Sequence, residues 1–238
     1  GVEVSISGDV VKTQNVTWNI GFNVGTAQNR IKSLAPGLNE FTKSYDGPKQ
    51  VVRVGQDINS WYLPKWVGVN SANGEPQWES LKADGSGYEV TNQYNNASSS
   101  VSLQIVGSAT PKMYGGLSTS VTYKRFTLSA ASSFTYGNKI YHRTREFVDS
   151  DGANFNFNMM QLADGWSRWQ NPGDNATHPK PVYGGNLNAN KPSSRYLEDG
   201  SYLRIRNVSL TYQIPPSFLS KIRLTNASGK GIMISGDT

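Results

Sequence analysis

The feature that most constrains the fold is the stretch from residue 112 to residue 141, in which two segments alternate strictly with period two. Successive side chains of a β-strand point to opposite faces, so each segment is predicted to be a strand with one apolar and one small polar face. The apolar face of the first strand comprises Leu117, Thr119, Val121 and Tyr123. That of the second comprises Phe126, Leu128, Ala130, Phe134 and Tyr136. The pair Lys124-Arg125 between them predicts a tight turn, and therefore a β-hairpin.

Aromatic residues flank this predicted turn. Tyr123 and Phe126 stand where a strand pair would leave a lipid core and meet the headgroups, with the two cations beyond them in water. This pattern is typical of a transmembrane β-barrel whose serines and threonines face a wet lumen. The inner face of a soluble β-sandwich also alternates, so the hairpin alone leaves both architectures open.

The same alternation opens the chain. The first predicted strand has the apolar residues Val2, Val4, Ile6 and Val10. After a turn at residues 12–15, the return strand has Val16, Trp18, Ile20, Phe22 and Val24. Each run covers about 9 to 11 residues, which is the length that a tilted strand needs to cross a bilayer. Soluble strands are more often about five or six residues long.

Loop lengths separate the two architectures. Long polar segments at about 27–114 and 142–199 alternate with short turns at 12–15, 124–125 and 214–222, which gives six strands, the last from about Arg223 to Ser235. Outer-membrane barrels have short periplasmic turns and long extracellular loops, whereas a sandwich gives no reason for this asymmetry. The pattern therefore favours an all-β, antiparallel, partial transmembrane barrel. Within the second long segment, a short helix is predicted at residues 156–163.

Composition excludes several classes of protein. The chain has no cysteine, which rules out a disulfide framework and thiolate metal sites. Its net charge of +6 is spread without a dense basic run, so nucleic-acid binding is not expected. There is also no run of 18 apolar residues, so no transmembrane helix is predicted.

Catalytic and metal-binding motifs are not evident. The two histidines, His142 and His178, lack a nucleophile or metal-ligand spacing. The run from Asp149 to Gly152 begins like a calcium loop, but Ala153 and Met160 stand where ligands would be needed. The sequence therefore predicts neither an enzyme nor a cofactor.

Two sets of residues are candidates for contacts outside the chain. We predict that Trp166 and Trp169 contact a substrate or a lid, since exposed aromatic faces can stack on sugar rings; packing of the loops is the alternative. Arg204 and Arg206 are predicted to share an outward face and meet lipid headgroups or lipopolysaccharide, or else to pair with Glu198, Asp199 or loop carboxylates. Along this stretch the apolar set changes parity between Ile205 and Val208.

Residues 194–212, SRYLEDGSYLRIRNVSLTY, closely resemble the near-C-terminal signature of SusC/RagA-type TonB-linked outer-membrane transporters. The resemblance extends, in the family's order, to residues 65–69, 73–76, 111–116 and 136–141. It implies a barrel of about 22 strands with a plugged lumen. Residues 1–238 would then be the C-terminal portion of that barrel. The plug, the TonB box and the first half of the barrel would precede Gly1, and a closing strand would follow the chain.

The resemblance also implies a function. Such proteins import oligosaccharides or peptides through the bacterial outer membrane, energised by the TonB complex and capped by a SusD-like surface lipoprotein. Six strands cannot close around a lumen, and unpaired backbone groups in hydrocarbon cost several kcal/mol each. We therefore expect neighbouring strands on both edges. The alternative is a soluble β-sandwich module that binds carbohydrate through surface tryptophans.

Overall fold

The computed structural model describes residues 1–44 and 47–215, which divide into two compact units. The first, the sheet unit, comprises the described residues of segments 1–28, 111–138 and 200–215. The second, the loop unit, comprises those of segments 29–110 and 139–199. The two long polar segments of the sequence thus form a structured body of their own.

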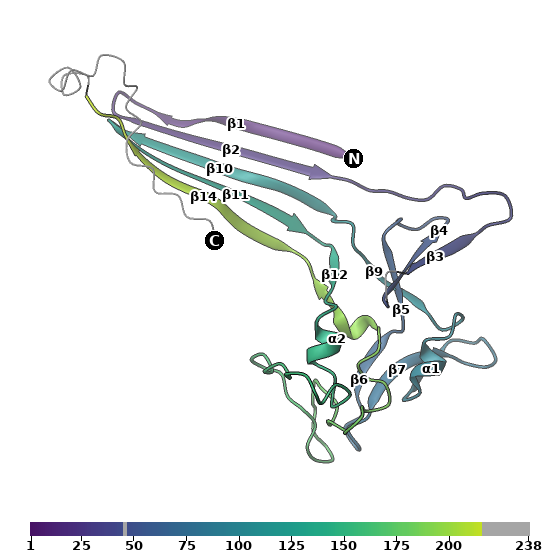
Figure 1. Ribbon diagram of the computed structural model, residues 1–238. Coiled ribbons are helices and arrows are strands. Elements are labelled where there is room, and N and C mark those ends of the chain that lie inside the picture. The colour runs from purple at the N-terminus through teal and green to yellow at the C-terminus, as the bar shows by residue number, and fades with distance from the viewer. Residues whose placement is uncertain (45–46, 216–238) are drawn as a thin grey trace. The chain divides into compact units, whose positions relative to one another are not determined.

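Five antiparallel strands of 11 residues each form the sheet unit, in the order β1-β2-β10-β11-β14 (Figure 1). Their bounds are β1 (Val2–Lys12), β2 (Val16–Thr26), β10 (Met113–Tyr123), β11 (Phe126–Tyr136) and β14 (Tyr202–Tyr212). The predicted hairpin is confirmed, with Tyr123 opposite Phe126 and Lys124 at φ 55° in the turn between them. The predicted turn from residue 216 onwards and the last strand, Arg223 to Ser235, lie outside the described residues.

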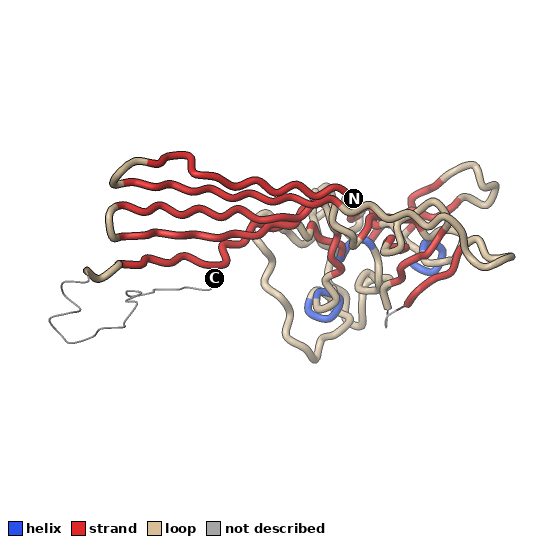
Figure 2. The backbone as a smooth tube through the Cα atoms, turned by 90° about the horizontal axis from the view of Figure 1, so that it is seen from above, coloured by secondary structure: helices blue, strands red, loops and turns tan. Residues whose placement is uncertain are grey.

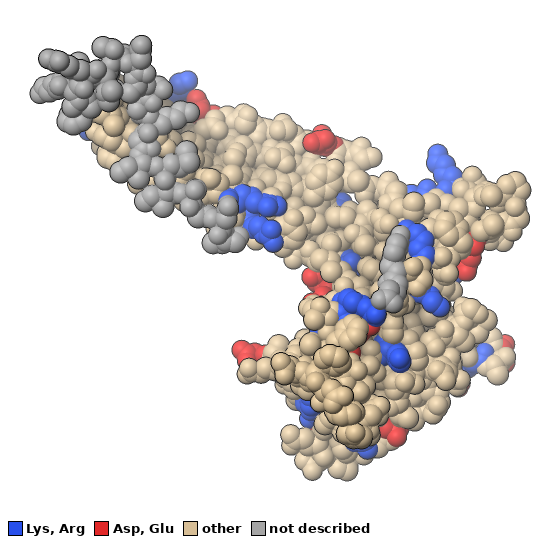
Figure 3. Space-filling model, viewed as in Figure 1, with Lys and Arg blue, Asp and Glu red and all other residues tan. Residues whose placement is uncertain are grey.

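Register places the apolar residues of neighbouring strands opposite one another. Phe22 pairs with Leu117, and Val121 pairs with Leu128. Leu128 in turn lies opposite Leu210 of β14. Because cross-strand partners share a face, one face of the sheet is apolar and the other carries mainly serine, threonine, asparagine and glycine. Charged side chains are few over the strands on the face of the sheet unit visible in Figure 3.

Two β-bulges correct the predicted faces. In β1, Asp9 pairs with Asn19 and Val11 with Trp18, so the extra residue is Val10, and Val11 continues the apolar face beyond it. A bulge inserts one residue into a strand and so reverses the parity beyond it. The predicted apolar positions Val2, Val4 and Ile6 agree with this register, and the bulge adds Val11, which the alternation did not place on the apolar face.

The bulge in β14 also explains the parity change noticed in the sequence. Ala131 pairs with Asn207 and Ser132 with Ile205, so Ile205 lies on the same apolar face as Val208. Arg204 lies opposite Ser133 on the polar face. Arg206, the extra residue, donates from its Nε to the Ser133 hydroxyl at 2.8 Å. The prediction that this arginine pair faces lipid was wrong, because the bulge turns both side chains to the polar face.

Short strands joined by long stretches of turn and irregular chain form the loop unit (Figure 2). A four-stranded antiparallel sheet has the order β3-β4-β5-β9, formed by Glu40–Ser44, Lys49–Arg53, Ser60–Leu63 and Gln104–Ser108. A three-stranded sheet comprises β6 (Trp66–Val69), β7 (Pro76–Leu81) and β8 (Tyr88–Thr91). The strands β12 (Lys139–Tyr141) and β13 (Leu197–Asp199) pair with each other. The helices are one turn each: α1 (Tyr94–Ala97), α2 (Arg145–Val148) and the 3₁₀ helix η1 (Ser194–Tyr196).

Two apolar centres hold the loop unit together. Val51, Tyr62 and Leu103 are buried against one another, with Ile105 packed on them. Trp78 is fully buried and makes edge-to-face contacts with Trp66 and Tyr94, with ring centroids 5.5 Å apart in both pairs. Such aromatic pairs contribute about 0.5–1.5 kcal/mol each beyond the area they bury.

The helix predicted at residues 156–163 is absent, because this segment consists of a turn and irregular chain. The Met160 N–H donates to the carbonyl of Val148 at 2.9 Å instead of to a carbonyl one helical turn before it. The nearby asparagines also favour turns over helix, since their side chains compete for backbone groups. In the part of the chain that the structure describes, no helix is long and apolar enough to span a membrane.

Candidate functional site

The loop unit contains a buried group of charged residues, here called the ionic cluster: Arg145, Asp149, Asp151, Arg168, His178 and Arg195. The side chains of Asp149 and Asp151 are fully buried, and that of Arg195 is 3% exposed. Burial of this many ionisable groups is costly unless each is paired and hydrogen-bonded. The cluster therefore needs a closely defined geometry.

Helix α2 and the turn that follows it place the two aspartates. Arg145 lies one helical turn before Asp149, and its Nη2 is 3.2 Å from an Asp149 carboxylate oxygen. Asp151 has φ 50° and Gly152 has φ 90°, so the chain reverses tightly here. A Cβ on Gly152 would lie 2.2 Å from the carbonyl oxygen of Val182, and only glycine fits.

Guanidinium groups from three separate segments meet at these carboxylates. Arg195, from η1, places Nη2 3.1 Å from Asp149 and makes a second ion pair with Asp151. Arg168 reaches both aspartates, at 3.2 Å and 2.6 Å. The cluster thus joins α2, the segment around residue 168 and the signature segment that begins at Ser194.

The charges of the cluster are fixed by this pairing. Burial alone would raise the pKa of Asp149, but the neighbouring His178 and the guanidinium groups of Arg195 and Arg145 hold that pKa well below its ordinary value. Burial opposes the charge of Arg195 too, yet Tyr196, Asp151 and Asp149 raise the pKa of Arg195 above its usual range. Both side chains therefore stay charged, as a rigid structural pair requires.

A hollow of about 520 Å³ lies beside the ionic cluster. It is lined by Trp66, Arg145, Trp166, Thr177, His178, Arg195, Leu197, Glu198 and Asp199. Arg145 also pairs with Glu198, Nη1 to Oε1, at 2.9 Å. A wall of aromatic faces and paired charges suits recognition of a polar ligand, since pockets of this size commonly hold small molecules.

The structure separates the two tryptophans predicted to contact substrate. Trp166 lines the hollow, where its ring lies 4.8 Å from that of His178 and 4.6 Å from the Arg145 guanidinium carbon. Trp169 does not line it. Its indole N–H donates to the carbonyl of Ser71 at 2.8 Å, and a Cβ on Gly74 would lie 2.5 Å from its ring. Contact of either residue with substrate stays a prediction.

The sequence contained one readable signal for the cluster that was missed. Arg145 and Asp149 have the spacing of an ion pair on a helix, but Asp149 and Asp151 were judged only against a calcium pattern. Their role is to bind arginines. Among the described residues, no group of three or more histidine, aspartate or glutamate side chains is placed to hold a metal ion.

Comparison with known proteins finds relatives both by sequence and by structure. The chain is 28% identical over 233 residues to TonB-dependent receptor P3 of Formosa agariphila, and 25% identical over 239 residues to TonB-dependent receptor P26 of the same organism. These alignments cover 94% and 96% of the chain. The predicted resemblance to SusC/RagA-type TonB-linked transporters is confirmed. No protein-family model matches the chain.

Solved structures agree about the fold. The RagAB peptide transporter superposes with a TM-score of 0.74 over 92% of this chain, at 24% identity. The RagAB peptide importer in its open-open state gives 0.74 over 91%, at 22% identity. The fold class predicted for this SusC/RagA-like chain, antiparallel strands of part of a large barrel with long loops, is confirmed. The chain spans only 22% to 25% of the length of the curated relatives it matches.

Proposed function

We propose that this SusC/RagA-like chain forms part of the wall and outer loops of a TonB-dependent nutrient importer in the bacterial outer membrane. The observation that carries the proposal is the exposure of the apolar face of the sheet unit. Ile6 is 67% exposed, Leu128 51% and Leu203 73%. Soluble proteins rarely expose a continuous apolar surface that crosses five strands, whereas a barrel wall turns such a surface toward lipid.

Strand length and aromatic positions support the same assignment. Eleven residues per strand match the about 9–11 residues of a tilted transmembrane strand. At the turn end of the sheet, the rings of Phe126 and Tyr212 lie 4.6 Å apart, and Tyr123 pairs with Phe126. Aromatic residues grouped at one level of the strands form the interfacial girdle of outer-membrane barrels.

We assign residues 1–238 to the C-terminal portion of the barrel, with the two long segments on the extracellular side. Among the described residues, β1 and β14 each have a strand neighbour on one side only. In hydrocarbon, an unpaired strand edge leaves backbone groups that cost several kcal/mol each. Further strands of the same protein would pair with both edges and close the barrel.

Substrate and partners follow from the relatives as proposals. The similar RagAB structures are described as a peptide transporter. We propose peptides or oligosaccharides as the substrate of this chain, a SusD-like surface lipoprotein as its lid and the TonB complex as its energy source. Trp166, at the hollow beside the ionic cluster, and Trp169 are our proposed contacts with the substrate or the lid.

The alternative of a soluble carbohydrate-binding sandwich is disfavoured by the same exposed face. A sandwich buries the inner faces of its sheets against each other. Here Val4, Leu117 and Leu210 are 51%, 47% and 45% exposed. An aqueous environment would leave that apolar area in water.

Site-specific labelling of the full-length protein in lipid vesicles tests the proposal, because this chain contributes no native cysteine. We expect a bimane label on Leu128→Cys to be quenched by nitroxide lipids. A label on Ser129→Cys, the adjacent residue on the polar face, is the matched control and should be quenched by an aqueous quencher instead. Equal aqueous quenching at both positions would overturn the assignment to the barrel wall.

A further inference from the structure

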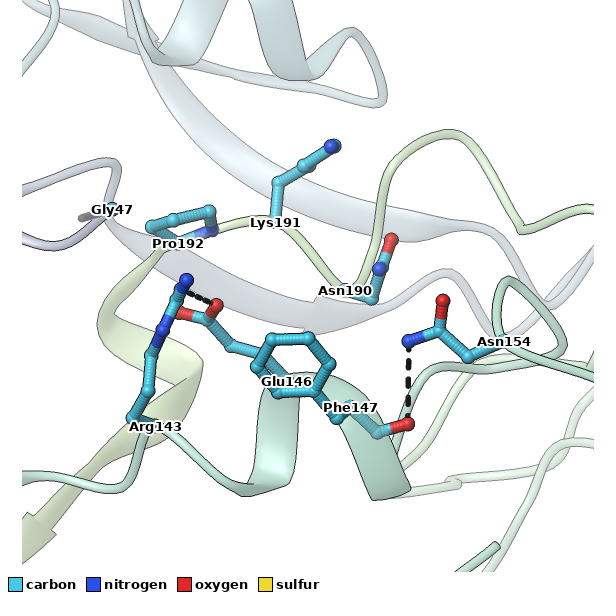
Figure 4. Close-up of a pocket in the computed structure, with 8 residues that line it drawn as sticks. All are labelled: Gly47, Arg143, Glu146, Phe147, Asn154, Asn190, Lys191 and Pro192. Carbon is cyan, nitrogen blue, oxygen red and sulfur yellow. Dashed lines mark hydrogen bonds and ion pairs between the residues drawn. The ribbon is translucent and has the colours of Figure 1, made fainter. Parts of the chain in front are cut away.

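A second hollow in the loop unit, here called the amide hollow, has a volume of about 350 Å³ (Figure 4). It is lined by Gly47, Arg143, Glu146, Phe147, Asn154, Asn190, Lys191 and Pro192. None of these residues lines the hollow beside the ionic cluster. In Figure 4, α2 supplies Glu146 and Phe147 on one side, and the segment from Asn190 to Pro192 faces them.

The negative charge in the amide hollow is already neutralised. One oxygen of Glu146 accepts from the Tyr141 hydroxyl, and the other pairs with the guanidinium of Arg143. The Glu146 side chain is only 7% exposed. Burial and the hydrogen bond to Glu146 raise the pKa of Tyr141 above its ordinary value, so this hydroxyl keeps its proton. Glu146 is therefore part of the floor and not a free acid.

Other polar groups of the amide hollow are unused within the described chain. The ammonium of Lys191 makes no ion pair there, and the side-chain amide of Asn190 makes no hydrogen bond. The Asn154 amide donates to the carbonyl of Phe147 at 3.4 Å and has its carbonyl oxygen left to accept. Besides the ion pair of Arg143 and Glu146, one further cation and two amide groups thus line the same small space (Figure 4).

Local packing holds the wall of the hollow in place. The guanidinium carbon of Arg143 lies 5.3 Å from the centre of the Phe147 ring. Gly47 has φ 129°, and a Cβ there would lie 2.6 Å from Arg143 Nη1. A side chain at residue 47 would crowd the arginine and strain the backbone. The side chains of Arg143 and Phe147 are thus held in place before any ligand enters.

We propose that the amide hollow binds a carboxylate group of the transported ligand, an inference that rests on the proposed function and specifies its substrate class. The Lys191 ammonium supplies the counter-charge, and a charge-assisted hydrogen bond is the strongest single contact available there. The amides of Asn154 and Asn190 donate to and accept from the hydroxyl or peptide groups beside that carboxylate. The carboxylate belongs either to a uronic acid of an oligosaccharide or to an acidic peptide.

Calorimetric titration of the full-length protein in detergent distinguishes these two sources. The probes are trigalacturonic acid and the tripeptide Ala-Glu-Ala, with methyl-esterified trigalacturonate and amidated Ala-Gln-Ala as their uncharged counterparts. We expect one acid to bind and its uncharged counterpart to bind at least about tenfold more weakly. That ratio corresponds to about 1.4 kcal/mol, which is within reach of one charged hydrogen bond. The acid that binds identifies the source.

Variants then locate the binding. Lys191→Met keeps the length of the side chain and removes its charge, so we expect about tenfold weaker binding of the acid. Asn190→Ala should also weaken it. Lys82→Met, at an exposed lysine of the loop unit outside the hollow, is the matched control and should bind as the wild type does. Because Lys191 is exposed, its variant should unfold at the wild-type temperature.

Two results would overturn the inference: neither acid binds the wild type, or one binds it and Lys191→Met equally well. Calorimetry requires neither TonB nor an energised membrane. Binding that depends on Lys191, in a protein shown not to span the membrane, would contradict the proposed function and leave the hollow as a carboxylate site. Import by a protein that binds neither acid would support the proposed function and contradict the carboxylate site.

Discussion

At the scale of single residues, the ionic cluster explains why the signature segment contains Arg195 next to Tyr196. The arginine reaches Asp149 and Asp151 from 46 and 44 residues away in sequence. Pattern reasoning identified the segment but could not pair residues so far apart, because no local period links them. The sequence also did not predict the tight turn at Gly152 or the one-turn helix α2. Both belong to the ionic cluster, whose ion pairs join residues that are distant in sequence.

Loss of Arg195 should strongly destabilise the loop unit. In Arg195→Met, Asp151 loses a buried partner, and breaking a buried ion pair costs about 3–5 kcal/mol. Limited proteolysis of the full-length protein would report this as faster cleavage within residues 139–199. Arg53→Met is the control: its pair with Glu40 is about one-third exposed and is expected to contribute about 0–1 kcal/mol. Equal protease sensitivity of the two variants would contradict a structural role for the cluster.

Acid should weaken the same unit. The folded-state pKa of Asp149 is below its unfolded value, so its contribution to stability is present above the unfolded pKa of about 3.9 and is lost as pH falls toward the folded pKa. We expect proteolytic protection to decline below about pH 4. Asp149→Asn should lower protection at neutral pH and flatten this dependence, whereas Asp164→Asn, at an aspartate outside the cluster, should keep the wild-type curve. A wild-type curve in Asp149→Asn would exclude this carboxylate as the titrating group.

At the scale of elements, alternation predicted the faces of β2, β10 and β11 correctly and failed in β1 and β14 only beyond their bulges. A bulge adds one residue without leaving a compositional mark, so period-two counting assigns the wrong face beyond it. In β14 the change of parity between Ile205 and Val208 was visible in the sequence, but only the register with β11 shows that the apolar face is continuous. The short strands of the loop unit escaped prediction because runs of four to six residues carry too few alternations.

The bulge in β14 makes a prediction about neighbouring residues. A cysteine at Arg204, on the polar face, should react with a water-soluble maleimide in the full-length protein reconstituted in lipid vesicles. A cysteine at Ile205, on the apolar face, should react only with a membrane-permeant one. The two positions are adjacent in sequence, so a difference in reactivity reports the face and not the depth. The opposite result would mean that β14 pairs in a register without the bulge.

At the scale of the whole molecule, the proposed function makes the sheet unit a section of a larger wall. On that proposal its apolar face contacts lipid, and the open edges of the sheet pair with further strands. The alternation over runs of about 9 to 11 residues predicted the lipid-facing strands, and the collinear motifs predicted that they belong to a larger barrel. The two hollows of the loop unit could not be foreseen, because each is lined by residues from segments that only the fold brings together.

Whether membrane insertion depends on the rest of the barrel can be measured by expressing residues 1–238 alone beside the full-length protein. We expect the full-length protein to enter the outer membrane and migrate differently on gels with and without heating, as closed barrels do. Residues 1–238 alone should not, since the five described strands with the predicted sixth cannot close around a lumen, and unpaired backbone groups at the open edges cost several kcal/mol each in hydrocarbon. Heat-modifiable insertion of this stretch by itself would show that its strands satisfy their own edges, and the proposal that further strands flank β1 and β14 would then be wrong.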